Sequence, residues 1–416
     1  MINYFYDCYR ILGKVYGEGA YLKQAISSVE IEEKNRALTV KTCYGVLDND
    51  IRLSYYIKKL CDKSPKLAIR TILKIAMYDI EFLGKHDYAV IDNAVELTKK
   101  LGKSGASGFV NAMLRKFVKT EISLPDKDKD NTEYLSVKYS YPRYAVELLV
   151  KDYGEEESEK IMSVTGGKTF VRFEKDGEKY LDERNVKYEK TCFDNLFVCD
   201  NFVRNEDYDK GVYTFQSIGS VAICDIVEKG ERLLDACSAP GGKSVLLSDK
   251  FKEIIACDIH PHRVELIKSY AERMNKKNVF ATVADSAVYN PWFKDAFDAV
   301  LCDAPCSSFG VAPDNPDVKI DGKKKDLKEI TALQYAILSN VSAYVKVGGF
   351  LYYSTCSVFN AENIKNVKRF LENNDNFEIV KTDCGLPHKD VEGTMQFLPH
   401  ISMGQGFYVA KMKRVK

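Results

Sequence analysis

The chain has 416 residues, of which 45% are hydrophobic and 29% are charged, and its formal net charge is +1. This length allows two or three domains with their own cores, and the composition is too apolar for a disordered protein. No run approaches the ~18–20 apolar residues of a membrane span, and the first residues do not resemble a secretory signal. The cysteines follow no repeated spacing, which favours a reducing compartment over a disulfide framework. We therefore expect a cytoplasmic multidomain protein.

The first 119 residues are predicted to be helical and are more basic than the rest. They carry 20 basic and 13 acidic side chains, whereas the remainder carries 41 and 47. Apolar residues recur at helical spacing in residues 71–83, 90–102 and 109–118, which predicts an all-α domain over residues 1–120. The net charge of +7 favours a nucleic-acid contact here, although ordinary solvated helix faces would give the same count.

A polar segment and a mixed region follow. The run LPDKDKDN combines proline with alternating charge, so we expect a linker over residues 121–133. Residues 144–164 have a helical pattern, while KTFVRFEK and NLFVCD read as short strands. This mixture predicts a small α+β module over residues 134–208.

From residue 209 to 416 the pattern alternates between strands and helices. Strands are expected at residues 232–237, 253–258, 278–285, 297–303, 349–355, 377–383 and 406–412. Helices are expected at residues 242–251, 260–275, 327–346 and 360–374. Apolar strands separated by amphipathic helices predict an α/β fold, a doubly wound and mostly parallel sheet that is covered on both faces.

Candidate ligand-binding residues follow the first four of these strands. The turn Pro240-Gly241-Gly242 lets the backbone approach a ligand closely, and it is neither a dinucleotide fingerprint nor a P-loop. The next three strands end in Asp258, Asp285 and Asp303. Each acid alone could equally be a turn or capping residue. Together they favour a nucleoside ligand without phosphate, with Asp258 on the ribose hydroxyls and Asp285 at the purine edge, which indicates S-adenosylmethionine rather than NAD or ATP.

Two cysteines follow adjacent strands, Cys306 after the fourth and Cys356 after the fifth. Most such cysteines are small buried hydrophobes, as we expect for Cys237, Cys257 and Cys302. No CxxC pair occurs and no histidine lies near Cys306 or Cys356 in the sequence, so we expect no metal site. Two thiols facing a methyl donor indicate nucleophilic catalysis, because a thiolate that adds to carbon 6 of a pyrimidine makes carbon 5 nucleophilic.

Two charged residues complete the predicted catalytic set. Asp303 would lie near the ring and stabilise its protonated form. Lys243 would lower the pKa of a thiol or help to move the proton. Spacing leaves open which cysteine attacks.

Several sequence motifs resemble known families. DACSAPGGKS, DAPCSSFG and STCS followed by NAEN together resemble the RNA cytosine-5 methyltransferase family, and YAVIDNAVELTKKLG with FVNAMLRKF resembles the RNA-binding antitermination factor NusB. The resemblance implies a class I S-adenosylmethionine-dependent methyltransferase fold over residues 209–416, with an antiparallel last hairpin strand. It also implies a NusB-like RNA-binding domain over residues 1–120 and a small α+β RNA-binding module over residues 134–208.

The resemblance also implies roles for individual residues. Cys356 would be the nucleophile, and Cys306 would help to release the methylated product. The cofactor site would comprise Cys237, Ser238, Ala239, Pro240, Gly241, Gly242, Lys243, Asp258, Asp285 and Asp303.

The implied reaction is methylation of carbon 5 of a cytosine in 16S rRNA, at the position conventionally numbered 967. The implied partner is 16S rRNA, naked or in a partly assembled small subunit, with a monomeric enzyme and no membrane. Two alternatives fit these residues less well. A methyltransferase that acts on a small molecule or a protein would need no thiol pair, and a non-catalytic RNA-binding protein would need neither the cysteines nor the glycine turn nor the three acids.

Three positions depart from the family pattern. Asp314 stands where basic residues are common, Ser217 follows Gln216 where an aspartate is common, and Gln405 replaces the aspartate of a DGFF-like ending. Catalysis needs none of the three, so we expect any effect to fall on RNA contacts.

Overall fold

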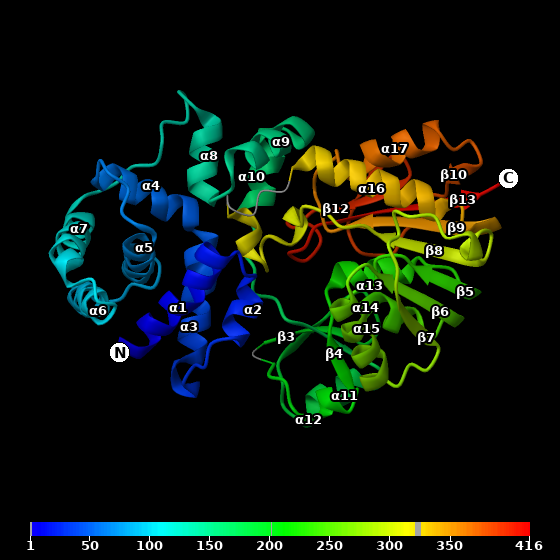
Figure 1. Cartoon of the computed structure of the whole chain (residues 1–416), viewed down its shortest axis with the longest axis horizontal. Helices are drawn as coiled ribbons and strands as arrows, with labels where there is room; N and C mark the ends of the chain where they lie inside the picture. The colour runs from blue at the N-terminus through cyan, green and yellow to red at the C-terminus, as the bar shows by residue number, and fades with distance from the viewer. Residues whose placement is uncertain (1, 201, 321–325) are drawn as a thin grey trace. The chain divides into compact units, whose positions relative to one another are not determined.

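The computed structural model describes residues 2–200, 202–320 and 326–416. The chain forms two compact units (Figure 1). Unit 1 comprises Met1–Ser163 and Asn315–Lys324, and unit 2 comprises Val164–Asp314 and Lys325–Lys416. The expected division of the chain near residues 120, 133 and 208 stays a prediction. None of the helices in the described ranges is long and apolar enough to cross a membrane.

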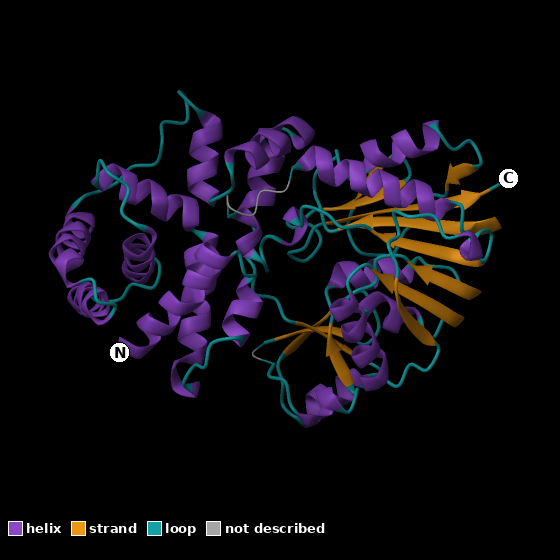
Figure 2. Cartoon of the chain, in the orientation of Figure 1, coloured by secondary structure: helices purple, strands orange, loops and turns teal. Residues whose placement is uncertain are grey.

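Unit 1 is built from helices (Figure 2). They are α1 (Ile2–Glu18), α2 (Leu22–Ser27), α3 (Glu33–Asp48), α4 (Asp50–Leu60), α5 (Leu67–Glu81), α6 (Asp87–Lys100), α7 (Ser107–Lys119), α8 (Asn131–Tyr139), α9 (Arg143–Tyr153) and α10 (Glu155–Ser163), with short 3-10 turns η1 (Ser104–Ala106) and η4 (Pro316–Lys319). The three helices predicted from apolar spacing are confirmed as parts of α5, α6 and α7. Helix α5 is the centre of the unit, because every residue from Thr71 to Asp79 is buried.

The turn η4 belongs to unit 1 although it follows the fourth strand of the large sheet in sequence. Lys319 is buried, and its Nζ donates to the backbone carbonyl of Asp48 at 3.0 Å and to Asp48 Oδ1 at 2.6 Å. Asp317 is also buried, and its Oδ2 accepts from the backbone N–H of Leu22 at 3.4 Å. Partners distant in sequence thus satisfy charges that the local sequence would place in solvent.

Unit 2 begins with a small antiparallel sheet. Its strands are β1 (Phe170–Phe173), β2 (Tyr188–Lys190), β3 (Leu196–Cys199) and β4 (Tyr213–Phe215), in the order β2-β3-β1-β4. Two short helices, α11 (Gly177–Glu183) and α12 (Glu206–Asp209), accompany it. The expected strands in KTFVRFEK and NLFVCD are confirmed as β1 and β3.

The large sheet of unit 2 has a parallel centre and an antiparallel edge. Its strands are β5 (Gly230–Asp235), β6 (Phe251–Asp258), β7 (Val279–Val283), β8 (Phe297–Asp303), β9 (Val345–Thr355), β10 (Phe377–Ile379), β11 (Lys389–Val391), β12 (Thr394–Phe397) and β13 (Phe407–Arg414). The order is β11-β12-β13-β9-β8-β5-β6-β7, with β10 beside β13. Strands β5 to β9 pair in parallel, and β13 runs antiparallel to β9. Each expected strand is present, although β10 ends at Ile379 rather than at residue 383, and β9 begins at Val345, inside the helix expected over residues 327–346. The hairpin of β11 and β12 is not among the expected strands.

Helices cover both faces of this sheet (Figure 2). They are α13 (Ile218–Asp225), α14 (Gly242–Leu247), α15 (Pro261–Arg273), α16 (Leu327–Ser342) and α17 (Ile364–Glu372). Neighbouring residues of one strand point to opposite faces. Leu233 of β5 accordingly packs in one apolar cluster with α13 and α14, whereas Leu234 packs in another with α16 and α17. The predicted doubly wound α/β fold is confirmed.

Candidate active site

The carboxyl ends of the parallel strands meet at one edge of the sheet. Asp235 ends β5, Asp258 ends β6 and Asp303 ends β8, and Asp303 lies opposite Ser354 of β9 in the register. Segments that leave neighbouring parallel strands emerge side by side. This edge is where an open α/β sheet binds its ligands.

The turn at residues 237–243 follows β5 and is held against β6. The backbone N–H of Ser238 donates to the Cys257 carbonyl at 2.8 Å, and that of Gly241 donates to the Ser238 carbonyl at 2.8 Å. Gly241 has φ +104°, and a Cβ there would lie 3.2 Å from atoms of Ile267. Only glycine suits this position, because the backbone conformation is strained for other residues. The turn therefore offers backbone rather than side chains to a ligand.

Asp235 lies beneath this turn with an unsatisfied oxygen. Its side chain is 1% exposed, Ser244 Oγ donates to its Oδ2 at 2.6 Å, and Oδ1 has no hydrogen-bond partner among the described residues. Burial raises the pKa of Asp235 to about 6. An orphaned acceptor beside a backbone-lined turn suits a ligand with hydrogen-bond donors, so the residues present fit S-adenosylmethionine.

Asp258 is 4% exposed, and its carboxylate is oriented by two neighbours. Its Oδ1 accepts from the backbone N–H of His260 at 3.0 Å, and its Oδ2 lies 3.2 Å from Arg263 Nη1. Arg263 Nη2 also donates to the Ala239 carbonyl in the turn at 3.2 Å. Arg263 therefore ties Asp258 to the turn, a link that strand-end spacing did not reveal. Asp285 is exposed, and its Oδ1 accepts from the N–H of Ala287 at 2.9 Å.

If Asp258 binds the ribose hydroxyls, Asp258→Ala should weaken S-adenosylmethionine binding by about 1.5–3 kcal/mol, the range for losing charge-assisted hydrogen bonds. Isothermal titration calorimetry measures this loss, and Asp285→Ala in parallel reports on the second acid. Unchanged affinity in a folded Asp258→Ala protein would remove Asp258 from the cofactor site.

Lys243 and Asp303 form an ion pair beside the cysteines. Lys243 Nζ lies 2.5 Å from Asp303 Oδ2, and Ser354 Oγ donates to Asp303 Oδ1 at 2.7 Å. Burial alone would lower the pKa of Lys243, but the Asp303 carboxylate more than offsets burial, and the pKa is raised. Lys243 is thus a fixed cation at neutral pH rather than a proton acceptor.

Cys306 and Cys356 meet at the strand ends. Their sulfurs are 2.7 Å apart, and Ser308 Oγ lies 3.4 Å from Cys356 Sγ. The hydrogen bond with Cys306 lowers the pKa of Cys356, and the same hydrogen bond together with burial raises the pKa of Cys306 well above the usual range. Of the two thiols, Cys356 is therefore the one that loses its proton more readily, and Cys306 is the one that keeps it.

The loop that carries Cys306 packs closely on its neighbours. The N–H of Gly310 donates to the Cys356 carbonyl at 3.0 Å, and that of Gly406 donates to the Gly310 carbonyl at 2.7 Å. A Cβ on Gly310 would lie 2.1 Å from the carbonyl oxygen of Gly406, so the close approach requires glycine. Cys257 and Cys302 are buried in the core, and Cys237 is half-buried. In the described ranges no group of side chains is arranged to hold a metal ion.

The three departures from the family pattern have structural partners. Gln405 Nε2 donates to Asp314 Oδ2 at 2.7 Å, so two of the departures form one pair. Ser217 Oγ accepts from the N–H of Ser220 at 3.3 Å and caps α13. Gln216 Nε2 donates to the Gly242 carbonyl at 3.1 Å, which links the small sheet to the turn.

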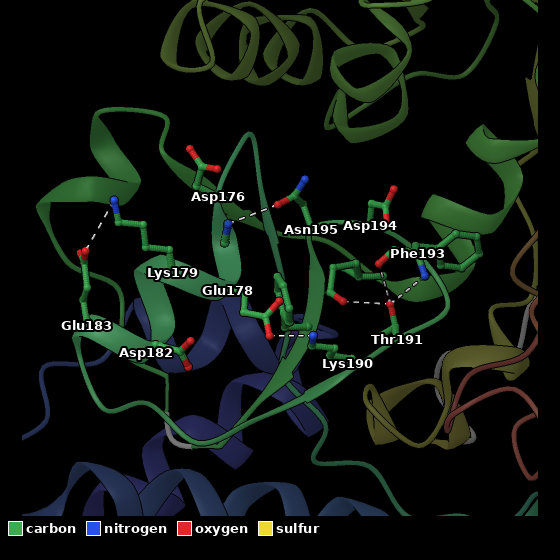
Figure 3. Close-up of a pocket in the computed structure, with 13 residues that line it drawn as sticks. Asp176, Glu178, Lys179, Asp182, Glu183, Lys190, Thr191, Phe193, Asp194 and Asn195 are labelled. Atoms are coloured by element: carbon green, nitrogen blue, oxygen red, sulfur yellow. Dashed lines mark hydrogen bonds and ion pairs between the residues drawn. The ribbon is translucent and has the colours of Figure 1, made fainter.

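A hollow of about 680 Å³ lies in the small α+β region of unit 2 (Figure 3). Its lining shares no residue with the turn or the cysteine loops, and Asp and Glu side chains outnumber Lys side chains in it. Lys190 there pairs with Glu178 at 2.6 Å. An acidic concavity repels phosphate groups, so RNA is not expected to follow it.

Comparison with known proteins identifies the family. Residues 223–413 match the family model described as 16S rRNA methyltransferase RsmB/F, and residues 9–119 match the NusB family. A Bacillus subtilis (strain 168) protein described as "Probable ribosomal RNA small subunit methyltransferase B" is 31% identical, with 94% of each chain covered. A Pasteurella multocida (strain Pm70) protein, "Ribosomal RNA small subunit methyltransferase B", is 28% identical over 98% of this chain and 95% of the relative.

Solved structures show the same fold. The crystal structure of PH0851 has a TM-score of 0.83 at 22% identity and covers 99% of this chain and 98% of its own. NSun6 from Pyrococcus horikoshii, solved with SFG, has a TM-score of 0.56 at 19% identity, covering 65% of this chain and 97% of its own.

The fold and the strand-end site define an S-adenosylmethionine-dependent methyltransferase of class I. Within that class, the chain belongs to the RsmB/F family of 16S rRNA methyltransferases and carries an N-terminal domain of the NusB family.

Proposed function

We propose that this protein methylates carbon 5 of a cytosine in 16S rRNA, at position 967, through a covalent bond between Cys356 and carbon 6. The observation that carries the proposal is the thiol pair at the carboxyl ends of β8 and β9, with 2.7 Å between the sulfurs. Methylation of oxygen or nitrogen needs no thiol adduct, whereas carbon 5 of cytosine is too poor a nucleophile without one. The names of the relatives support the small-subunit rRNA as the substrate.

In this reaction the Cys356 thiolate adds to carbon 6, and the electron pair of the double bond makes carbon 5 an enamine carbon. Carbon 5 then takes the methyl group that S-adenosylmethionine supplies. The Asp303 carboxylate would hold the protonated ring by a charge-assisted hydrogen bond. The hydrogen bond with Cys306 is the largest cause of the lowered pKa of Cys356; the Lys243 cation lowers that pKa further, and the Asp303 carboxylate opposes it.

Release of the product requires loss of the proton from carbon 5 and expulsion of Cys356. The hydrogen bond to Cys356 is the largest cause of the raised pKa of Cys306. Once Cys356 is a thioether it bears no charge, so Cys306 can lose its own proton to solvent and accept the proton of carbon 5. The electron pair of that bond restores the ring double bond, and Cys356 leaves as a thiolate.

The NusB-like helices supply a surface suited to holding the RNA backbone. Exposed basic side chains lie at the end of α6, in the segment after it and in the last turns of α7: Lys99, Lys100, Lys103, Arg115, Lys116 and Lys119. Phosphate contacts from such residues add affinity without reading sequence. We also propose that the enzyme acts as a cytoplasmic monomer on naked rRNA or a partly assembled small subunit.

Bisulfite sequencing of 16S rRNA tests the proposal, since 5-methylcytosine resists conversion. In cells that lack the protein, the cytosine at position 967 should become convertible, and the wild-type gene but not Cys356→Ala should restore protection. Protection lost at another cytosine would identify a different target. Unchanged protection at every cytosine of 16S rRNA would overturn the proposal.

A further inference from the structure

The serines that follow the two cysteines donate to the same oxygen atom. Ser307 Oγ and Ser357 Oγ each donate to Glu362 Oε1 at 2.5 Å. Cys306 precedes the first serine and Cys356 precedes the second. A single carboxylate thus joins the two cysteine-bearing loops directly beside the reacting sulfurs.

The other carboxylate oxygen is also fully used. Glu362 Oε2 accepts from the backbone N–H of Ser307 at 2.9 Å and from Gln334 Nε2 at 2.9 Å. Gln334 Nε2 also donates to the Pro305 carbonyl at 2.9 Å, on the other side of Cys306. Glu362 is 0% exposed, and all four of its donors are neutral. A buried carboxylate is costly unless it is hydrogen-bonded, so such complete pairing fixes its geometry and that of its donors.

Two backbone hydrogen bonds flank the Cys306 loop, and Ser307 Oγ lies 3.2 Å from Ser357 Oγ. Beyond the strand ends, the N–H of Ala304 donates to the Ser354 carbonyl at 2.9 Å, and the N–H of Gly310 donates to the Cys356 carbonyl at 3.0 Å. Cys306 lies in the loop between these two contacts. The hydrogen bonds to Glu362 join the middle of the Cys306 loop to the Cys356 loop.

The geometry points to Glu362 as a positioning residue that holds the Cys306 and Cys356 loops at the separation that both thiol steps require. Glu362 holds the two loops through Ser307 and Ser357, the residues that follow the two cysteines. Its charge adds a second effect, because the carboxylate raises the pKa of Cys306 and so favours the proton on that cysteine. The expected effect of Glu362 on methylation rests on the proposed function, whereas its effect on the spacing of the two thiols can be measured without any RNA.

The dithiol reagent phenylarsine oxide measures the spacing without any RNA, since one arsenic bridges two adjacent thiols. The wild-type protein should bind it at a site that Cys356→Ser removes, which separates this pair from the other cysteines. Glu362→Ala and the isosteric Glu362→Gln should weaken that binding at least tenfold. In glutamine an amide N–H₂ replaces one acceptor oxygen, so two of the four donors lose their acceptor, and the serine hydroxyls can keep their contacts with the nitrogen only by reversing from donors to acceptors.

Kinetics and thiol labelling complete the test. Both variants should lower kcat for RNA methylation about tenfold to a hundredfold while KM for RNA and S-adenosylmethionine affinity stay near wild type. Iodoacetamide should label Cys306 more relative to Cys356 in Glu362→Gln, because the charge that favours its proton is gone. A general packing defect would not redistribute the label in this way. Glu372→Gln, an exposed glutamate at the end of α17, serves as the matched control.

The outcomes are distinguishable. If Glu362→Ala fails to fold, Glu362→Gln and the Ser307→Ala/Ser357→Ala double variant carry the test. Wild-type arsenical binding together with wild-type kcat in folded Glu362→Gln and double-serine variants would overturn the positioning role. If wild type methylates no RNA, the proposed function fails, and the arsenical and labelling measurements still decide the role of Glu362.

Discussion

Cys356→Ala should abolish methyl transfer, a loss of at least about 10³-fold, because Cys356 is the proposed nucleophile of the covalent step. Cys306→Ala should still form the bond to carbon 6 and transfer the methyl group, but release should slow. Denaturing electrophoresis with labelled RNA should then show a covalent protein–RNA species for Cys306→Ala and none for Cys356→Ala.

The matched control is Cys302→Ala on the same strand as the Cys306 loop. Cys302 is buried in the core and faces α16 and α17, so its loss costs packing without touching the thiol pair. It should destabilise the protein and trap no RNA. Trapping by Cys356→Ala instead of Cys306→Ala would reverse the two roles.

The thiol pair also predicts a pH effect in Cys306→Ala. Its hydrogen bond is the leading cause of the lowered pKa of Cys356, so its removal raises that pKa. Adduct formation needs the thiolate, and its rate in Cys306→Ala should therefore rise at higher pH than in wild type. An unshifted profile would show that Cys306 does not assist ionisation of Cys356.

The sequence predicted the architecture where apolar periodicity is strong. Strands β5, β6, β8 and β9 carry buried apolar runs because helices cover both faces of the sheet, and this pattern is visible without homologues. The hairpin of β11 and β12 is different: every residue of β12 is buried, including Gln396, whose side chain is satisfied by Asn363 at 2.8 Å and the Phe407 carbonyl at 2.9 Å. In the sequence, a glutamine such as Gln396 suggests an exposed position, because the partners that allow it to be buried are distant along the chain.

The sequence predicted only part of the candidate site, because it shows which residues end the strands but not which side chains meet. Strand ends can be located from the sequence, so Asp258, Asp303 and Cys356 could be named. Spacing does not say where side chains point, and it gave no sign that Arg263 joins Asp258 to the turn or that Glu362 joins both loops. Such links depend on rotamers and on packing between segments far apart in the chain.

The second large effect is expected from substitutions of Lys243 and Asp303, which should both slow methylation but shift its pH–rate profile in opposite directions. Asp303→Asn removes the carboxylate expected to hold the protonated ring, and Lys243→Met removes the cation that pairs with it. Asp303→Asn should slow single-turnover methylation by about 10²–10⁴-fold, the usual range for a positioned acid–base group. Lys243→Met should slow it by about 10–10²-fold, the range for losing a charge-assisted hydrogen bond. Ser354→Ala, which removes only the 2.7 Å hydrogen bond to Asp303, should cost far less.

The pH–rate profiles of these variants should move in opposite directions. The Lys243 cation lowers the pKa of Cys356 and the Asp303 carboxylate raises it. The acidic limb reports formation of the thiolate, so it should move to higher pH in Lys243→Met and to lower pH in Asp303→Asn. A Lys346→Met control, which breaks the 2.7 Å ion pair with Asp298 away from the site, should leave the profile unchanged. Shifts of the same sign in both variants would mean that the Cys356 thiolate is not the group whose ionisation limits the reaction.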